Sequence, residues 1–404
     1  MTSYLELRKD RRKIMFVDEV KKELTGHIIP FWKGMRDDTY GGYYGWLDQQ
    51  LQLDKKAEKG CILNSRILWF FSNAYVMLGE KELLDEANHG YDFLTTYCID
   101  KEYGGIYWSL NYDGTPLDTT KHTYNQAFAI YALCAYYEAS KNAQAKDLAM
   151  ELYHLIEDRC CDTGGYLEAF KRDFSPESNE KLSENGVLAE RTMNTLLHVM
   201  EAYTQLYKIT NDSSVRLRLV WMLELVRDKI YNPTLQRQEV FFDKDYHSLI
   251  DLHSFGHDIE AAWLIDRALE ILNMPKLTLA IGKITAQLEK RTYELAYDGR
   301  SFANECEKGV VNEHRIWWVQ AEAIVGFINA YQKNPEKKEY LEAAEHIWEF
   351  VKACVVDSRD GSEWFNEVDK EGRPYPDRPI VEPWKCPYHN GRMCMELMKR
   401  LGNM

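Results

Sequence analysis

The sequence predicts an all-α fold, an (α/α)6 barrel in which six helical hairpins form an inner and an outer ring of helices, with short strands in the loops at one end. Two recurring features predict it. Apolar segments that close on the same residue pair alternate with amphipathic segments, and turns with paired glycines and an aromatic residue connect them. Repeat units of about 60 to 70 residues are too long for a thin solenoid, so we expect them to close on themselves.

The predicted inner helices share a common ending. Ala74-Tyr75, Ala135-Tyr136, Ala202-Tyr203 and Ala330-Tyr331 each close a segment that is apolar on most faces. Such segments suit helices that are buried on nearly every side. The expected inner helices are therefore residues 62–78, 123–137, 192–207, 258–272, 317–331 and 390–401.

The segments between them have an apolar and a polar face, as expected for helices packed on the outside of the inner ring. They are residues 83–98, 147–160, 215–231, 277–297 and 340–356, and residues 16–32 supply a sixth at the start of the chain. The predicted order is therefore about twelve helices, alternately buried and half-exposed.

The connections repeat as well. Tyr40-Gly41-Gly42-Tyr43-Tyr44, Tyr103-Gly104-Gly105-Ile106-Tyr107 and Thr163-Gly164-Gly165-Tyr166 are close copies, and residues 241–243, 301–305 and 362–367 are looser ones. Paired glycines followed by aromatic residues are typical of tight turns that lead into short strands or extended loops.

Composition indicates one large catalytic domain over residues 1–404, with about residues 1–14 as a charged N-terminal extension. A chain of 404 residues with 45% hydrophobic content can bury a large core, and it contains no Pro/Gly/Ser-rich linker. The net charge of −14 would repel nucleic acids and anionic membranes, so we expect neither as a partner and favour a neutral small-molecule substrate.

Residues 1–13 are rich in charge and lack the apolar stretch of a signal peptide, and no run of 18 or more apolar residues follows. We therefore expect a cytoplasmic protein. We also expect it to be a monomer or weak dimer. Its nine cysteines lack the paired C-x2-C spacing of a zinc site and are interpreted as reduced packing residues. No glycine-rich phosphate loop follows a strand, and we expect no cofactor.

Polar and aromatic residues gather at the expected N-terminal ends of the inner helices. Aligning the repeats on their endings puts Arg66, Asn194, Glu260 and Glu322 in equivalent positions, and around them lie His122, Tyr124, Asn125, His198, His257, Trp317, Trp318, Trp384 and His389. Taken singly, each has an ordinary explanation as a helix cap or a hydrogen-bonded core residue. Their coincidence at one end of five or six repeats predicts a shared pocket.

One of these helices raises the question of a metal. His257 and Glu260 are three residues apart, so the carboxylate can orient the imidazole and set its basicity. With His253 they superficially resemble a zinc helix. However, Ser254 stands where that motif requires glutamate, and Gly256 favours a helix that starts only afterwards, so we expect no metal site.

Several motifs resemble those of the cellobiose 2-epimerases, within the N-acylglucosamine 2-epimerase superfamily. They are WKCPYHNGRMC at 384–394, SFGHDIE at 254–260 and WWVQAE at 317–322, together with KHTYN at 121–125, SRILW at 65–69 and TMN at 192–194. The resemblance runs over nearly the whole chain except about the first dozen residues. It implies an (α/α)6 barrel, in agreement with the repeats.

The resemblance also implies an activity, the interconversion of glucose and mannose at the reducing end of a β-1,4-linked disaccharide. By motif match, His257 and His389 are the expected acid/base pair and His198 a further essential histidine. The expected substrate-binding residues are Arg66, Tyr124, Asn194, Glu260, Trp318 and Trp384, and we add His122 from the polar helix starts.

These residue types fit the chemistry. Epimerising C2 of an aldose requires ring opening, removal of the proton next to the aldehyde, and return of a proton to the other face. Two histidines suit the two roles because the ordinary imidazole pKa lies near neutrality. The enediolate that forms carries negative charge, which a fixed cation such as Arg66 would stabilise. Trp318 and Trp384 offer flat faces for sugar rings, although tryptophans in barrels also serve as core.

Alternatives share the fold. A glycoside hydrolase would need two carboxylates across the scissile bond, and Glu184, Asp258, Glu260 and Glu322 are the candidates, but the concentration of histidines disfavours it. An N-acylglucosamine 2-epimerase and a mannose-type aldose–ketose isomerase share the enediolate step and remain open. A sugar-binding or protein-interaction scaffold, with polar helix ends acting only as caps, also remains open.

Overall fold

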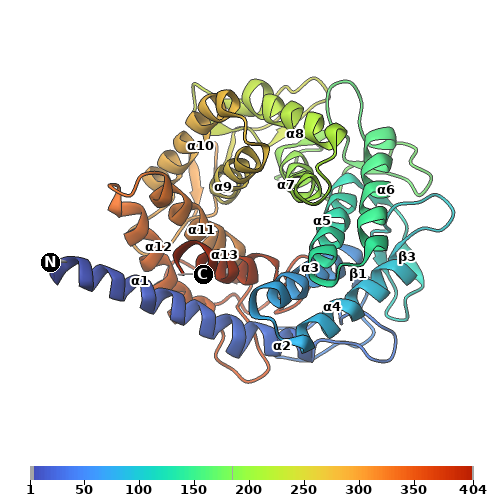
Figure 1. Cartoon of the computed structure of the whole chain (residues 1–404), viewed down its shortest axis with the longest axis horizontal. Helices are drawn as coiled ribbons and strands as arrows, with labels where there is room; N and C mark the ends of the chain where they lie inside the picture. The colour runs from blue at the N-terminus through green and yellow to red at the C-terminus, as the bar shows by residue number, and fades with distance from the viewer. Residues whose placement is uncertain (1–3, 184, 403–404) are drawn as a thin grey trace.

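The structure is a computed structural model that describes residues 4–183 and 185–402, without the side chains of residues 4–12. Two concentric rings of helices form an α/α barrel (Figure 1). The predicted all-α barrel is therefore confirmed. The first three residues of the expected N-terminal extension lie outside the described residues, and the backbone from Tyr4 belongs to the first helix.

The inner ring contains the six apolar segments. Its helices are α3 (Cys61–Leu78), α5 (Thr123–Ser140), α7 (Met193–Thr210), α9 (Phe255–Leu272), α11 (Trp317–Lys333) and α13 (Tyr388–Leu401). Each contacts the next, and α13 contacts α3, which closes the ring. Their side chains are buried on almost every face, which explains why all six were predicted from apolar content.

Helix α9 begins earlier than expected, at Phe255, and Gly256 lies in its first turn instead of before it. A Cβ atom at position 256 would lie 2.7 Å from the indole of Trp318 and 2.8 Å from Val319. Gly256 is therefore required by the close approach of α9 to α11, which explains why it does not mark the helix boundary.

The outer helices are α4 (Lys81–Phe93), α6 (Ala143–Arg159), α8 (Ser213–Leu225), α10 (Pro275–Leu295) and α12 (Lys338–Phe350). The sixth is α1 (Tyr4–Glu23), which packs against α13, so the two ends of the chain together make the last hairpin. Four outer helices end in a π-helical turn, a feature that the apolar pattern did not predict: η1 (Leu24–Ile28, followed by α2, Ile29–Gly34), η2 (Leu94–Cys98), η3 (Val226–Ile230) and η4 (Val351–Val355).

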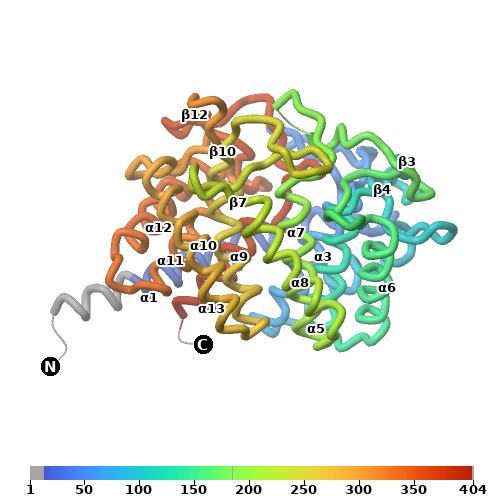
Figure 2. Tube along the Cα trace, turned by 90° about the horizontal axis from the view of Figure 1, so that it is seen from above, coloured from blue at the N-terminus to red at the C-terminus, as the bar shows by residue number. Residues whose placement is uncertain are grey.

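Short antiparallel strands occupy the loops at the end of the barrel where the inner helices begin (Figure 2). Strands β4, β6 and β13 each directly precede an inner helix and pair with a strand from the following connection. This pairing links neighbouring repeats around the mouth. The strands are β1 (Lys59–Gly60), β2 (Ser109–Leu110), β3 (Pro116–Asp118), β4 (Lys121–His122), β5 (Ala169–Phe170), β6 (Arg191–Thr192), β7 (Tyr231–Asn232), β8 (Arg237–Gln238), β9 (Phe241–Phe242), β10 (Leu252–Ser254), β11 (Glu305–Glu307), β12 (Val310–Asn312), β13 (Arg315–Ile316) and β14 (Glu367–Val368).

A repeated ion pair fixes each turn to the start of an inner helix. The basic residue two positions before the helix reaches an aspartate at the start of the turn: Lys59 to Asp37 at 2.6 Å, Lys121 to Asp100 at 3.1 Å, Arg191 to Asp162 at 2.7 Å and Arg315 to Asp298 at 2.8 Å. The aspartate also accepts hydrogen bonds from the turn backbone, for example from Thr39 and Tyr40 onto Asp37. These contacts hold the loops that surround the mouth.

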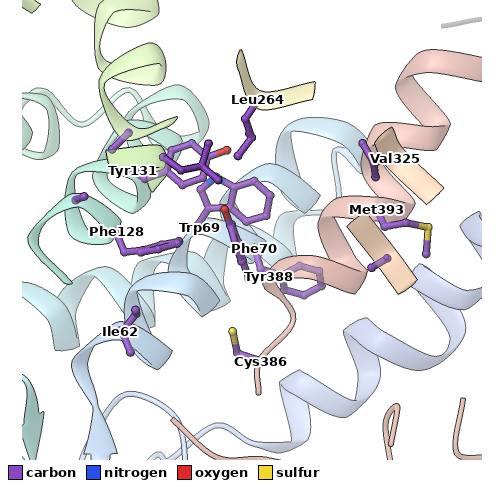
Figure 3. Close-up of a cluster of buried hydrophobic side chains, with 14 of the residues drawn as sticks. Ile62, Trp69, Phe70, Phe128, Tyr131, Leu264, Val325, Cys386, Tyr388 and Met393 are labelled. Atoms are coloured by element: carbon purple, nitrogen blue, oxygen red, sulfur yellow. The ribbon is translucent and has the colours of Figure 1, made fainter. Parts of the chain in front are cut away.

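Aromatic side chains fill the inside of the inner ring below the mouth. Trp69 of α3 stacks on Tyr131 of α5 with ring centroids 5.3 Å apart, and Tyr388 of α13 meets the edge of Trp69 at the same distance (Figure 3). All three are buried. They pack together one helical turn below Arg66 and fill the inside of the barrel at that level.

Candidate active site

A cavity of about 360 Å³ lies at the loop end of the barrel, among the N-terminal turns of the inner helices. This volume is within the range of sites for small ligands, roughly 300–1,000 Å³. Nine of the ten residues that the sequence analysis expects to act in catalysis or substrate binding line it, namely Arg66, Tyr124, Asn194, His198, His257, Glu260, Trp318, Trp384 and His389. The repeats therefore bring these residues together at one place.

His389 is held by a carboxylate on the neighbouring inner helix. Its Nδ1 lies 2.7 Å from Oε1 of Glu322, which leaves Nε2 for the cavity. The other oxygen of Glu322 accepts a hydrogen bond from the indole of Trp263 at 2.9 Å. Burial, and then the nearby guanidinium of Arg392, lower the pKa of His389, so its imidazole is neutral at neutral pH.

Arg392, one turn further along α13, links three glutamates. Its guanidinium donates to Oε1 of Glu201 at 2.5 Å, to Oε1 of Glu260 at 2.5 Å and to Oε1 of Glu322 at 2.7 Å. Its side chain is almost completely buried, with 2% exposed, and it also bonds the Tyr388 hydroxyl. The cation of Arg392 therefore joins helices α7, α9, α11 and α13 beneath the cavity.

His198 has a carboxylate partner of its own. Nδ1 of His198 lies 2.9 Å from Oε2 of Glu201, and the Tyr388 hydroxyl donates to the same oxygen at 2.5 Å. Burial opposes ionisation of Glu201, but Arg392 and His198 outweigh it and lower its pKa to about 2. Glu201 is therefore a carboxylate at neutral pH and fixes the orientation of His198.

The partner of His257 differs from the one expected. Its Nδ1 lies 2.7 Å from the hydroxyl of Ser254, whereas Glu260 bonds to Arg392. The three-residue spacing does put His257 and Glu260 on one helix, but Ser254, just before the helix, reaches the imidazole first. Burial lowers the pKa of His257 to about 3, so this imidazole is neutral as well.

His257 and His389 flank the same aromatic ring. The Trp318 indole lies 4.9 Å from the His257 ring and 5.4 Å from the His389 ring, measured between centroids. The two imidazoles come from α9 and α13, on either side of α11, which carries Trp318. They therefore approach the cavity from different walls.

Arg66 has no carboxylate partner within the described part of the chain. It donates to the Tyr124 hydroxyl at 2.8 Å, and its guanidinium lies 4.1 Å above the ring of Phe128 and 4.9 Å from that of Tyr388. Its Nε is buried without a hydrogen-bond acceptor in the described chain. A cation that is buried against aromatic rings and lines a cavity is suited to meet negative charge on a ligand.

The remaining predicted residues lie around the rim or behind it. Trp384 contacts Tyr124 and Trp108, and Asn194 lines the cavity with a buried amide oxygen that accepts no hydrogen bond from the described residues. His122 is the exception, because its ring packs against Trp108 at 4.7 Å and does not line the cavity. Its location behind Trp108 follows from its place on strand β4, one residue before α5.

Sequence reasoning missed the residues that orient the histidines. Ser254, Glu201, Tyr388 and Arg392 were not among the candidates, although Arg392 stands in the motif around His389. The outer part of the cavity is lined by further residues that the sequence did not single out: Lys181, Asn304, Glu305, Asn366, Glu367, Arg378 and Glu382.

The carboxylates do not form the arrangement expected for the alternative hydrolase. Asp258 accepts from His253 at 2.8 Å and does not line the cavity, and Glu184 lies outside the described residues. Glu260 and Glu322 are both bonded to Arg392. Glu260, Glu322 and His389 place ligand atoms within 4.8 Å of one another, but Nη2 of Arg392 already lies against Oε1 of both glutamates. The chain itself thus supplies the cation at this point.

Comparisons with known proteins place these observations in a wider context. The N-acylglucosamine 2-epimerase (GlcNAc 2-epimerase) family profile matches residues 42–391. The chain is 52% identical to the cellobiose 2-epimerase of Eubacterium cellulosolvens, over 94% of this chain and 97% of that one. No helix in the described residues is long and apolar enough to span a membrane.

Solved structures agree with this similarity. A sugar epimerase from a ruminal bacterium superposes with a TM-score of 0.94 at 49% identity, covering 95% of this chain and 99% of that chain. The cellobiose 2-epimerase of Bacillus thermoamylovorans B4167 gives 0.92 at 45% identity, covering 96% and 99%.

Proposed function

Because this chain belongs to the N-acylglucosamine 2-epimerase family, we propose that its cavity is the active site of a disaccharide 2-epimerase. The protein is an isomerase that interconverts glucose and mannose at the reducing end of a β-1,4-linked disaccharide such as cellobiose. The observation that carries this proposal is the pair of histidines, His257 and His389, on different walls of one cavity that also contains an unpaired buried arginine.

His389 and His257 act as the two acid/base groups. His389 is neutral at neutral pH, and Glu322 directs its Nε2 towards the cavity, so it can accept the C2 proton of an open-chain sugar. The imidazolium that forms is stabilised by the same carboxylate. His257 serves the opposite face of C2, and because the reaction is reversible, each histidine removes the proton in one direction and returns it in the other.

Arg66 stabilises the enediolate between these two proton transfers. Its guanidinium is held by the Tyr124 hydroxyl and by aromatic rings, so it needs no rearrangement when negative charge develops on the sugar oxygens. His198, fixed by Glu201, assists ring opening. Trp318 and Trp384 supply the apolar faces against which the sugar rings stack.

We further propose that the enzyme works without a metal ion, in the cytoplasm, and as a monomer or weak dimer. Arg392 provides the positive charge that the buried glutamates require. All nine cysteines are free, and six of them are fully buried, which suits a reducing compartment.

Proton NMR in D2O tests the reaction. The purified protein, treated with a metal chelator, is incubated with cellobiose while the C2 proton and the reducing-end signals are followed. Deuterium at C2 together with a new reducing-end mannose is the expected result. Free glucose would indicate hydrolysis instead, and a ketose as the main product would indicate an aldose–ketose isomerase.

Variants connect the reaction to the site. Substituting His257→Asn or His389→Asn should abolish epimerisation, because each removes one of the two acid/base groups that inversion at C2 requires. The exposed His154 on α6 offers the matched control, and His154→Asn should leave turnover unchanged. If both active-site variants still epimerised cellobiose at the wild-type rate, the assignment of the acid/base pair would be wrong.

A further inference from the structure

Glu260 has few hydrogen-bond donors for a buried carboxyl group. Its side chain lines the cavity and is 1% exposed. Oε1 accepts one hydrogen bond, from Arg392 at 2.5 Å, and Oε2 is buried with no partner among the described residues. An ionised carboxylate in such a place would leave one oxygen without any compensating donor.

The two other glutamates bonded to Arg392 are much better satisfied. Glu201 accepts from Arg392, Tyr388 and His198. Glu322 accepts from Arg392, Trp263 and His389. Since donors stabilise the ionised form of a carboxyl group, a proton shared within this cluster resides preferentially on Glu260.

The balance of charge points the same way. Three carboxyl groups face two buried cations, Arg392 and Arg66, and His198, His257 and His389 have lowered pKa values and are neutral at neutral pH. Protonation of one carboxyl group makes the buried cluster neutral. The titratable groups facing Glu260 are His257 on its own helix, Glu322 on α11, Tyr388, His389 and Arg392 on α13, His198 and Glu201 on α7, Tyr124 on α5 and Arg66 on α3.

We infer that Glu260 enters the catalytic cycle as a neutral carboxylic acid, and that its O–H group donates a hydrogen bond to the sugar oxygen on which negative charge develops in the enediolate. This role rests on the proposed function. An ionised Glu260 would repel that charge, whereas a neutral donor in a buried site stabilises it. Burial and the neighbouring Glu322 raise the pKa of Glu260 to about 8 in spite of Arg392, which agrees with this assignment.

Infrared spectroscopy of the sugar-free enzyme tests the protonation state directly. The carbonyl stretch of a protonated carboxylic acid shifts when H2O is replaced by D2O. At pH 6 we expect such a band in the wild-type protein that is absent from Glu260→Gln, and in the wild type it should decrease with a midpoint near pH 8. The absence of any Glu260-dependent band at pH 6 would overturn the inference.

Glu289→Gln is the matched control for the spectrum. Glu289 is also a buried carboxyl group, held by Lys333 and Asn329 away from the cavity, and burial raises its pKa to about 7. Its substitution should leave the Glu260 band in place. The wild-type titration needs no variant at all, so it remains informative even if a substitution impairs folding.

Kinetics test the donor role. Glutamine is neutral and keeps a donor at the same place, so Glu260→Gln should keep kcat within about tenfold of the wild type. Wild-type activity should decrease above pH 8 as Glu260 ionises, and this decrease should be absent in Glu260→Gln. Glu260→Ala removes the donor and should lower kcat on the order of 10²- to 10³-fold. Equal losses in the two folded variants would show that the charge of Glu260 is needed, and would overturn the inference.

The two readouts separate this inference from the proposed function. If the band is present but cellobiose is not epimerised, the protonation state stands and the substrate assignment fails. If cellobiose is epimerised and the band is absent, the enzyme assignment stands and the role of Glu260 as a neutral donor fails.

Discussion

Oε1 of Glu322 lies 2.7 Å from Nδ1 of His389, so a carboxylate on one inner helix determines which nitrogen of an imidazole on the next faces the cavity. A contact of this kind fixes the tautomer of the histidine and stabilises the imidazolium that forms when it accepts a proton.

Replacing that carboxylate should impair the chemical step. We expect Glu322→Gln to lower kcat on the order of 10²- to 10⁴-fold with little change in KM, because the imidazole loses the partner that sets its tautomer. Steady-state kinetics with cellobiose provide the measurement.

The chain offers a closely matched control. Glu23 lies 2.7 Å from Nδ1 of His27 and accepts from an indole, that of Trp364, just as Glu322 accepts from Trp263. Glu23 is on the outer ring, so Glu23→Gln should leave kcat unchanged. Equal losses in both variants would mean that a general loss of stability explains the effect.

Removing Arg392 should destabilise the fold as well as the site. Arg392→Met leaves Glu201, Glu260 and Glu322 buried without their shared cation. Loss of one partner of a buried ion pair costs about 3–5 kcal/mol, and we expect the free energy of unfolding to fall by at least this amount. Urea denaturation followed by circular dichroism measures the free energy of unfolding. Arg373, which is 76% exposed and pairs with Asp369 on the surface, is the control, and Arg373→Met should cost less than about 1 kcal/mol.

Stability should decrease as the pH falls below neutrality. Burial lowers the pKa values of His122 and His257 to about 3, whereas in the unfolded chain each has a pKa of about 6.5. Below pH 6.5 the unfolded chain therefore binds protons that the native state does not, so the free energy of unfolding falls as the pH drops from 6.5 towards 5. Denaturation at several pH values checks this, and His122→Phe, which keeps the ring contact with Trp108, should reduce the slope. An unchanged slope in His122→Phe would contradict the assignment to His122.

Two helical glycines should respond in opposite directions to alanine. At Gly326 a Cβ atom would lie 2.4 Å from Cγ1 of Ile259 and 2.9 Å from its backbone oxygen, so Gly326→Ala should destabilise the protein by about 1–3 kcal/mol. At Gly282 in α10 no atom other than the neighbouring backbone of the same helix lies within 4 Å of that position, and Gly282→Ala should stabilise the protein by about 0.5–1 kcal/mol. Thermal denaturation of both variants measures the difference. A stabilising Gly326→Ala would show that α9 and α11 approach less closely than described.

The fold was largely predictable from the sequence, because the inner helices are apolar on nearly every face and their endings repeat. The π-helical turns at Leu94–Cys98 and elsewhere were not, since the apolar pattern of an outer helix continues through them unchanged. The start of α9 was misplaced because Gly256 serves helix packing.

The location of the candidate site was predictable for the same reason, since the repeats bring their polar ends to one mouth. The hydrogen-bond partners were not. Glu201 and Tyr388 are 187 residues apart, so only the closed ring reveals their contact. Ser254 was noted as the residue that replaces the glutamate of a zinc-helix motif and as part of the SFGHDIE motif, but its bond to His257 depends on how the chain enters α9.

The packing of α1 on α13 has a consequence for the newly made protein. A ribosome synthesises α13 after the other helices of the barrel, so the ring stays open during most of translation. Until α13 is made, α1 lacks the inner helix against which it packs. His389 and Arg392 arrive with that final helix. A nascent or prematurely terminated chain that lacks α13 thus has five hairpins but no acid/base pair, and sugar turnover begins only when translation has passed the closing segment.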